Sequence, residues 1–149
     1  PTHNIPTIKL SGQDLEKTKP KLEEGELKIF PIALKLKTPK RFMIQGFGLD
    51  SLWEGEMEVV NYLSDTQLVG KVHIVKGKLD LLGKVMKISK GNIEFDKAFI
   101  NNPKLSLIAV RDVEGITVQL IIEGRASNPK FTFMSVPALP EEEILSRLL

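Results

Sequence analysis

The chain has 149 residues, of which 42% are hydrophobic and 27% are charged. These values predict one soluble globular domain and exclude a disordered chain, and no run approaches the roughly eighteen apolar residues of a transmembrane helix. The formal net charge of +2 is too small to indicate nucleic-acid binding, and the absence of cysteine excludes disulfides and thiolate metal sites. The sequence begins with Pro1 and has no initiator methionine, so we expect residues 1–149 to be a single domain cut from a longer protein.

The first third of the chain predicts short strands at 5–10, 27–37, 42–45 and 53–59. Pro31 and Pro39 cannot donate a ladder hydrogen bond, so they predict a bulge inside the second strand and an end after it. Residues 11–26 are polar and rich in lysine, with Pro20 among them, and predict an exposed connection with at most a short helix.

From residue 68 to residue 133, apolar and polar side chains alternate in one short run after another. Because strand side chains alternate with a period of two, the apolar members predict one continuous aliphatic face. Burial of each such side chain contributes roughly 1.5–3 kcal/mol, so this face must be covered by the chain itself, by a partner or by lipid. The predicted inward set is Val72, Ile74, Leu79, Leu81, Met86, Ile88, Ile93, Phe95, Leu105, Leu107, Ile116, Val118, Leu120, Ile122, Phe131 and Phe133.

Glycines divide this region into predicted strands. Lys76-Gly77, Gly83-Lys84 and Lys90-Gly91 each interrupt the alternation for about two residues, which is the length of a tight hairpin turn. We therefore expect an antiparallel meander over residues 70–96. A longer turn at 112–115 and a connection at 127–129 lead to the last strands, at 116–123 and 130–134.

Charge is segregated between neighbouring segments. Glu54, Glu56 and Glu58 lie in a segment without basic residues, and six lysines follow between Lys71 and Lys90. Pairing of the two strands would place Glu56 and Glu58 opposite Lys71 and its neighbours, which is the favoured interpretation. A cation site on the carboxylates and a basic patch for phospholipid headgroups are the alternatives.

The tail predicts the one convincing helix. Pro140 suits a helix start, Glu141, Glu142 and Glu143 complement the positive end of its dipole, and Arg147 lies in the last turn. A helix of about ten residues is marginal alone, so it must dock, and we expect it to plug or gate the open end of the sheet beside Phe131 and Phe133. A simple structural cap is the alternative. Its apolar face is Ile144, Leu145, Leu148 and Leu149.

Catalytic chemistry has no visible support. His3 lies in a proline-flanked terminus, and His73 lies on the polar side of a strand without a second imidazole. The phosphate-binding, zinc-protease and serine-hydrolase motifs are missing from the sequence. Asp112 and Glu114 beside Arg111 are typical of a solvated turn. We expect neither an enzyme nor a cofactor.

Several motifs give the chain a resemblance to the C-terminal domain of the TamB family. The resemblance covers residues 34–149, although Ala138 stands where that family usually has a second proline. Its residues are Thr38 to Phe42, Gly46 to Ser51, Gly70 to Gly77, Leu81 to Gly83, Gly91 to Phe95, Ala109 to Arg111, Glu114 to Val118, Gly124, Asn128-Pro129, Phe131 to Phe133, Ser135 and Pro137 to Leu149.

The resemblance implies an all-β domain in which a curved, mostly antiparallel sheet forms a trough with a hydrophobic interior, called a β-taco, followed by a short helix. It further implies a long periplasmic protein that is anchored in the inner membrane by an N-terminal helix. Such a protein works with a TamA-like outer-membrane barrel protein of the Omp85 type. The family is implicated in carrying phospholipid between the two membranes and in assembling outer-membrane proteins, so the inward set would line a groove for acyl chains.

Three functional hypotheses remain open at this level. The apolar face is a groove for lipid, or an exposed sheet edge pairs with a barrel strand or an unfolded outer-membrane protein by β-augmentation. Alternatively, the domain is a closed β-sandwich with a dry core. All three hypotheses predict the same alternation of side chains.

Overall fold

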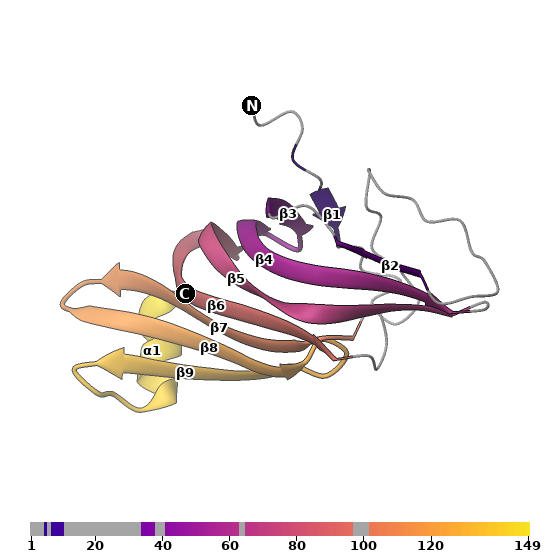
Figure 1. Ribbon diagram of the computed structural model, residues 1–149. Helices are drawn as coiled ribbons and strands as arrows, with labels where there is room; N and C mark the ends of the chain where they lie inside the picture. The colour runs from indigo at the N-terminus through magenta and orange to yellow at the C-terminus, as the bar shows by residue number, and fades with distance from the viewer. Residues whose placement is uncertain (1–4, 6, 11–33, 38–40, 63–64, 97–101) are drawn as a thin grey trace.

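The computed structural model describes residues 5, 7–10, 34–37, 41–62, 65–96 and 102–149. Within these residues, one nine-stranded sheet is followed by one short helix (Figure 1). The elements are β1 (Thr7–Lys9), β2 (Leu34–Lys37), β3 (Arg41–Gly46), β4 (Leu49–Tyr62), β5 (Asp65–Leu81), β6 (Lys84–Asp96), β7 (Lys104–Val113), β8 (Ile116–Arg125), β9 (Lys130–Val136) and α1 (Glu141–Leu148).

The sheet is open and curved. Its strands follow the order β1-β3-β4-β5-β6-β7-β8-β9, and β2 pairs with β4. Only β1 and β3 run parallel, while the other described pairs are antiparallel. The prediction of an all-β fold with a curved, mostly antiparallel sheet is confirmed, and the alternative of a closed sandwich is not what the chain adopts.

Several predicted elements need correction. The strand predicted at 53–59 is the middle of the longer β4, and the turn predicted at 112–115 contains only Glu114 and Gly115. Both turn residues have positive φ angles, of 26° and 87°, which allow a two-residue hairpin. The expectations for residues 11–26, Pro31 and Pro39 fall outside the described residues.

Two of the three predicted hairpin turns are wrong. Gly83 does lie in the β5–β6 turn, but Gly77 and Gly91 lie inside β5 and β6, which are 17 and 13 residues long. The alternation changes phase in each strand because the pairing register shifts there. Leu52 and Trp53 pair with Lys76 and Ile74, and Ile88 and Lys90 pair with Ala109 and Ile108. Each shift is a β-bulge, which moves the inward positions from even to odd residue numbers within one continuous strand.

Close packing on the inner face of the sheet explains why glycine occupies these positions. A Cβ atom at Gly91 would lie 3.0 Å from Trp53 Cη2, and one at Gly77 would lie 2.9 Å from Ser51 Cβ. Trp53 is fully buried, and its Nε1 donates to Ser51 Oγ over 2.8 Å. Ser51 Oγ donates in turn to the carbonyl oxygen of Ile44 over 2.9 Å. The indole therefore lies on the concave side of the sheet, and its N–H has a hydrogen-bond acceptor.

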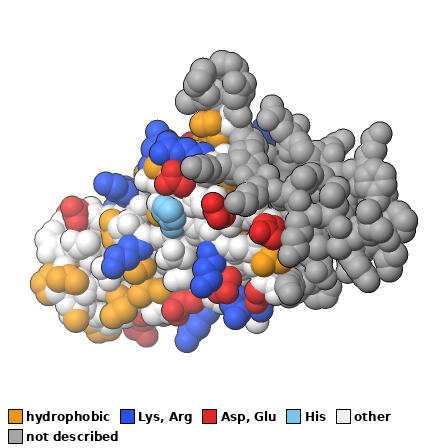
Figure 2. Space-filling view, in the orientation of Figure 1, with side chains coloured by type: hydrophobic (Ala, Val, Ile, Leu, Met, Phe, Trp, Pro, Cys, Tyr) orange, Lys and Arg blue, Asp and Glu red, His pale blue; other side chains and the backbone are white. Residues whose placement is uncertain are grey.

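The outer face matches the predicted opposition of charges at one position, Glu56 and Lys71, and not at Glu58. Glu56 pairs with Lys71 across β4 and β5, whereas Glu58 pairs with Val69. Glu54 lies 3.2 Å from Arg41 and 3.4 Å from His73, and the hydrogen bond from Arg41 lowers the pKa of Glu54. Basic and acidic side chains are interspersed on this face (Figure 2). The described residues contain no cluster of three or more potential metal ligands.

We predict that Gly91→Ala destabilises the domain by about 1–3 kcal/mol, because the new methyl group would press on Trp53. Trp53→Phe removes the ring atom nearest to Gly91, so the double variant should lose less stability than the sum of the single variants. Urea denaturation of the four proteins measures this coupling. Ser106→Ala, at an exposed position of β7, is the control, and strictly additive losses would contradict the contact.

Candidate functional site

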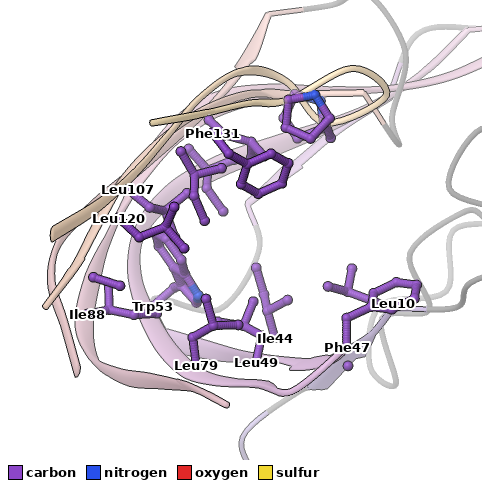
Figure 3. Close-up of a pocket in the computed structure, with 18 of the residues that line it drawn as sticks. Leu10, Ile44, Phe47, Leu49, Trp53, Leu79, Ile88, Leu107, Leu120 and Phe131 are labelled. Atoms are coloured by element: carbon purple, nitrogen blue, oxygen red, sulfur yellow. The ribbon is translucent and has the colours of Figure 1, made fainter. Parts of the chain in front are cut away.

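The concave face of the sheet encloses a cavity of about 620 Å³. Its wall is apolar except for one lysine (Figure 3). The lining residues are Ile8, Lys9, Leu10, Ile44, Gly46, Phe47, Leu49, Trp53, Leu79, Leu81, Ile88, Ile93, Phe95, Pro103, Leu105, Leu107, Ala109, Leu120, Ile122, Ala126, Pro129, Phe131 and Phe133.

Two phenylalanines flank the mouth of this trough. Phe47, in the β3–β4 turn, is 58% exposed, and Phe131, on β9, is 57% exposed. Figure 3 shows Phe47 and Leu10 on one side of the opening and Phe131 on the other. Large apolar side chains are thus left in contact with solvent on both lips, which is typical of a ligand-binding or interaction site.

The structure places eleven of the sixteen residues in the predicted inward set on the cavity wall. The other five belong to the same core but not to the cavity. Val72, Met86, Ile116 and Val118 are buried, and Ile74 packs partly buried against them. The bulges are what keep all sixteen on one side, because without them half of β5 and of β6 would face solvent.

Sequence reasoning missed the contribution of β1, β3 and β4. Phe42 and Ile44 lie two positions apart on one face of a predicted short strand, but the predicted inward set does not include them. In β4 the inward positions include Ser51 and Gly55 between Trp53 and its neighbours, so the apolar period is interrupted. A Cβ atom at Gly55 would lie 2.5 Å from the carbonyl oxygen of Lys71, and the Ser51 side chain is buried against Gly77.

Helix α1 covers part of the same apolar core without lining the cavity. Ile144 and Leu148 are each 1% exposed, whereas Leu145 is half-buried and Leu149 is 63% exposed. The helix contacts β9, and Figure 1 places it beside β8 and β9, toward the β7–β8 turn. Phe131, at the opposite end of β9, keeps its exposure. The apolar helix face is therefore only half buried, and the helix lies away from the mouth.

Hydrogen bonds hold the connection from β9 to α1. Ser135 Oγ donates to the carbonyl oxygen of Pro137 over 2.8 Å and accepts the Leu139 N–H over 3.0 Å. Pro140 is the N-cap residue, one position before the first helical residue Glu141, and it makes no side-chain cap hydrogen bond. Glu141, Glu142 and Glu143 in the first turn stabilise the positive end of the helix dipole.

An ion-pair cluster fixes the opposite end of the trough. Arg125 on β8 donates to both carboxylate oxygens of Asp96 on β6, over 2.8 and 2.7 Å, across the intervening strand β7. These hydrogen bonds raise the pKa of Arg125. Asn102 joins the cluster by accepting from Arg125 and, through its side chain, from the Ser127 N–H. The connections that carry the lining residues Pro103 and Ala126 are held together here.

The side chains that line the cavity are almost all aliphatic or aromatic. Lys9 is the only titratable residue on the wall described here, and it is exposed. His73 lies on the outer face, with 58% of its side chain exposed. No helix among the described residues is long and apolar enough to cross a membrane. The site can accommodate hydrocarbon, and it brings no acid–base pair or nucleophile together.

An open, curved sheet that presents an apolar trough, with a helix packed at one end, defines a trough-shaped class of β domain. A model of the family described as the TamB C-terminal domain matches residues 6–149, and the chain belongs to that family. It is also similar to the translocation and assembly module subunit TamB of Haemophilus influenzae, with 28% identity over 121 residues. That match covers 78% of this chain and 9% of the relative, so the chain spans about a tenth of the relative's length.

The helix packing predicts a sharp contrast between two adjacent leucines. Leu148→Ala should reduce the free energy of unfolding by about 2–5 kcal/mol, because the side chain is almost fully buried. Leu149→Ala should change it by less than about 0.5 kcal/mol, because that side chain is largely exposed. Thermal or chemical denaturation measures both. Equal losses would show that α1 does not dock in the orientation described.

Proposed function

We propose that the trough binds the acyl chains of phospholipid. The composition of the wall carries this proposal. Of the 23 lining residues, 22 are uncharged, and the only polar side-chain group among those 22 is the Trp53 indole N–H. That N–H already donates a hydrogen bond to Ser51. Transfer of each methylene group from water to such a surface contributes about 0.8 kcal/mol. Water in the trough would make an unfavourable contact with this apolar wall, and an acyl chain would remove that contact.

We further propose the cellular role that the family implies. As the C-terminal domain of a TamB-like protein, the chain would lie in the periplasm, and the complete protein would be anchored in the inner membrane. It would carry phospholipid toward the outer membrane and support the assembly of outer-membrane proteins together with a TamA-like barrel protein. The relative's name, a subunit of a translocation and assembly module, supports this role.

The position of α1 modifies the expected gate. Because no helix residue lines the cavity, α1 in this proposal is an end cap that shortens the trough rather than a plug in its mouth. Acyl chains would then enter between Phe47 and Phe131 or from the end near Pro129.

The single tryptophan of the chain provides a direct test. Trp53 lies on the cavity wall, so phospholipid with brominated acyl chains should quench its fluorescence, while the unbrominated lipid should not. Titration with brominated lipid gives the apparent affinity. A protein that stays folded and shows no quenching at saturating lipid would contradict the proposal.

Two residues on the same strand supply a matched pair of variants. Phe131 faces the trough and Met134 faces outward, with 57% and 50% exposure, so aspartate at either position should leave the fold intact. Phe131→Asp should weaken lipid binding by roughly tenfold, since a partly buried aromatic contact is lost. Met134→Asp should leave it unchanged. Equal effects would attribute the quenching to adsorption on the outside of the sheet.

A second candidate function rests on the edge strand β9. Among the described strands, β9 pairs only with β8, so its other side is an open edge. Its outward side chains Met134 and Val136 are 50% and 63% exposed, and Figure 2 shows hydrophobic side chains toward this part of the outer face. Long apolar edges of this kind accept an added strand. We propose β-augmentation by a barrel strand or an unfolded outer-membrane protein as the alternative role.

Cysteine crosslinking tests this second role, because the natural chain has no cysteine. In the full-length protein, cysteine at Thr132 or Met134 on β9 should crosslink to outer-membrane protein strands in cells. Cysteine at Ser106, exposed on the interior strand β7, should not. Crosslinking of equal strength at Ser106 would show general proximity instead of strand addition.

A further inference from the structure

Two hairpin turns on one lip of the trough carry exposed apolar side chains at their tips. The turns that join β3 to β4, β5 to β6 and β7 to β8 are Phe47-Gly48, Leu82-Gly83 and Glu114-Gly115. All of these residues have positive φ angles, which favour asparagine, aspartate or glycine in such two-residue turns. The first position is polar in the third turn only. Large apolar residues therefore occupy the other two tips although the backbone there disfavours them.

Leu82 is the more exposed of these two tips. Its exposed fraction is 79%, the highest of any large hydrophobic side chain that the structure describes, and it does not line the cavity. Hydrogen bonds hold its turn in place. The Gly83 N–H donates to Asp80 Oδ1 over 2.8 Å, and the Asp80 N–H donates to the carbonyl oxygen of Gly48 over 2.9 Å. The β5–β6 hairpin thus presents a leucine to solvent at a fixed position beside the β3–β4 turn.

Two lysines on the outer face stand behind this tip. Lys78 on β5 lies directly opposite Lys87 on β6, and both are exposed. Like charges at directly opposite positions destabilise a pair of strands. Neither lysine forms an ion pair with a carboxylate in the part of the chain that the structure describes. Asp50 lies opposite Lys78 on β4, and its carboxylate accepts a hydrogen bond from Gln45 over 3.2 Å.

The surrounding surface shows that this positive charge is local. Lys71, on the same strand, lies between Glu56 and Glu94 in the pairing register, so its charge has acidic neighbours on both sides. The third turn has Glu114 at its tip, and residues 141–143 at the start of α1 are all glutamates. Positive charge and exposed apolar tips thus coincide at the β5–β6 hairpin, and acidic residues gather toward β7, β8 and α1.

We propose that the β5–β6 hairpin docks on the surface of an anionic lipid bilayer. Leu82 enters the headgroup region, and Lys78 and Lys87 lie close to the lipid phosphates. Apolar insertion combined with positive charge is the usual basis of reversible binding to anionic membranes. The acidic tip at Glu114 points away from the bilayer. This inference goes beyond acyl-chain binding, because it concerns the outside of the sheet and does not require an occupied trough.

Binding to lipid vesicles tests the apolar tip. The chain should bind vesicles of equal parts phosphatidylglycerol and phosphatidylcholine at least tenfold more tightly than vesicles of phosphatidylcholine alone. Leu82→Asn should weaken binding to the anionic vesicles by roughly tenfold, because the apolar contact is lost. Its melting temperature should not fall, because asparagine suits the positive φ angle.

The equivalent position in the third turn supplies the matched control. Glu114→Asn changes the same turn position and should not weaken binding to the anionic vesicles. Equal weakening by the two variants, or full binding by Leu82→Asn, would overturn the insertion of Leu82. Equal binding to anionic and neutral vesicles would overturn the proposal as a whole.

Replacement of both lysines tests the charge. The double variant Lys78→Gln, Lys87→Gln should bind anionic vesicles roughly twentyfold more weakly, and added salt should remove the difference from the natural chain. Its melting temperature should not fall, because the repulsion between the two lysines is removed. Lys71→Gln, between two glutamates, is the control and should change binding by less than about twofold. Undiminished binding by the double variant would contradict the proposal.

A parallel measurement separates this inference from the proposed function. Quenching of Trp53 by a brominated lipid below its micelle-forming concentration reports on the trough alone, and Leu82→Asn should not change it. Vesicle binding without such quenching would overturn acyl-chain binding and leave the docking inference intact. Quenching without binding to anionic vesicles would overturn the docking inference alone.

Discussion

The close packing of buried Trp53 against Gly91 of β6 is the constraint on which the trough depends. A sheet with one large apolar face must either be covered or curl until the face covers itself. Here three long strands bend at nearly the same level, and the indole fills the inside of the bend. A side chain at Gly91 would press on Trp53, and one at Gly77 would press on Ser51, Ile74 and Ile88, so neither position has room for a larger residue.

This arrangement leaves the concave face partly unfilled. A closed sandwich buries its inner face against a second sheet, and the packing of such an interior has few voids larger than a water molecule. In this chain the sheet curls only far enough to bring the side of β1 and β3 to face β9 across an opening, and exposed phenylalanines remain on both lips. The cavity is therefore a consequence of incomplete closure, and its apolar wall favours hydrocarbon as the occupant.

The two ends of the trough are held in different ways. Near the β7–β8 turn, Ile144 and Leu148 of the terminal helix extend the apolar core. At the other end, the Arg125–Asp96 pair joins β8 to β6 across the intervening strand β7. One end of the trough is held by apolar packing and the other by an ion pair, and the lining residues carry no polar side chain apart from Lys9 and the indole of Trp53. The middle of the wall therefore presents almost only apolar groups.

The sequence by itself determined the fold class and about half of the wall, eleven of its 23 residues. Strict alternation in β7, β8 and β9 predicted the inward residues directly, because an uninterrupted strand keeps its period of two, and the helix followed from its acidic start and apolar stripe. Resemblance in the motifs around Gly46 to Ser51 and Pro137 to Leu149 predicted the family.

Only the tertiary structure decided that β5 and β6 are continuous. A change of phase beside a glycine is produced equally by a hairpin and by a bulge, and the difference lies in whether a distant side chain, here Trp53, packs against that glycine. The same holds for the mouth between Phe47 and Phe131 and for the placement of α1 away from it, whereas the trough itself was expected from the family resemblance and not from the alternation. Each depends on how far the sheet curls, which is a property of contacts between strands far apart in the sequence and leaves no local pattern to read.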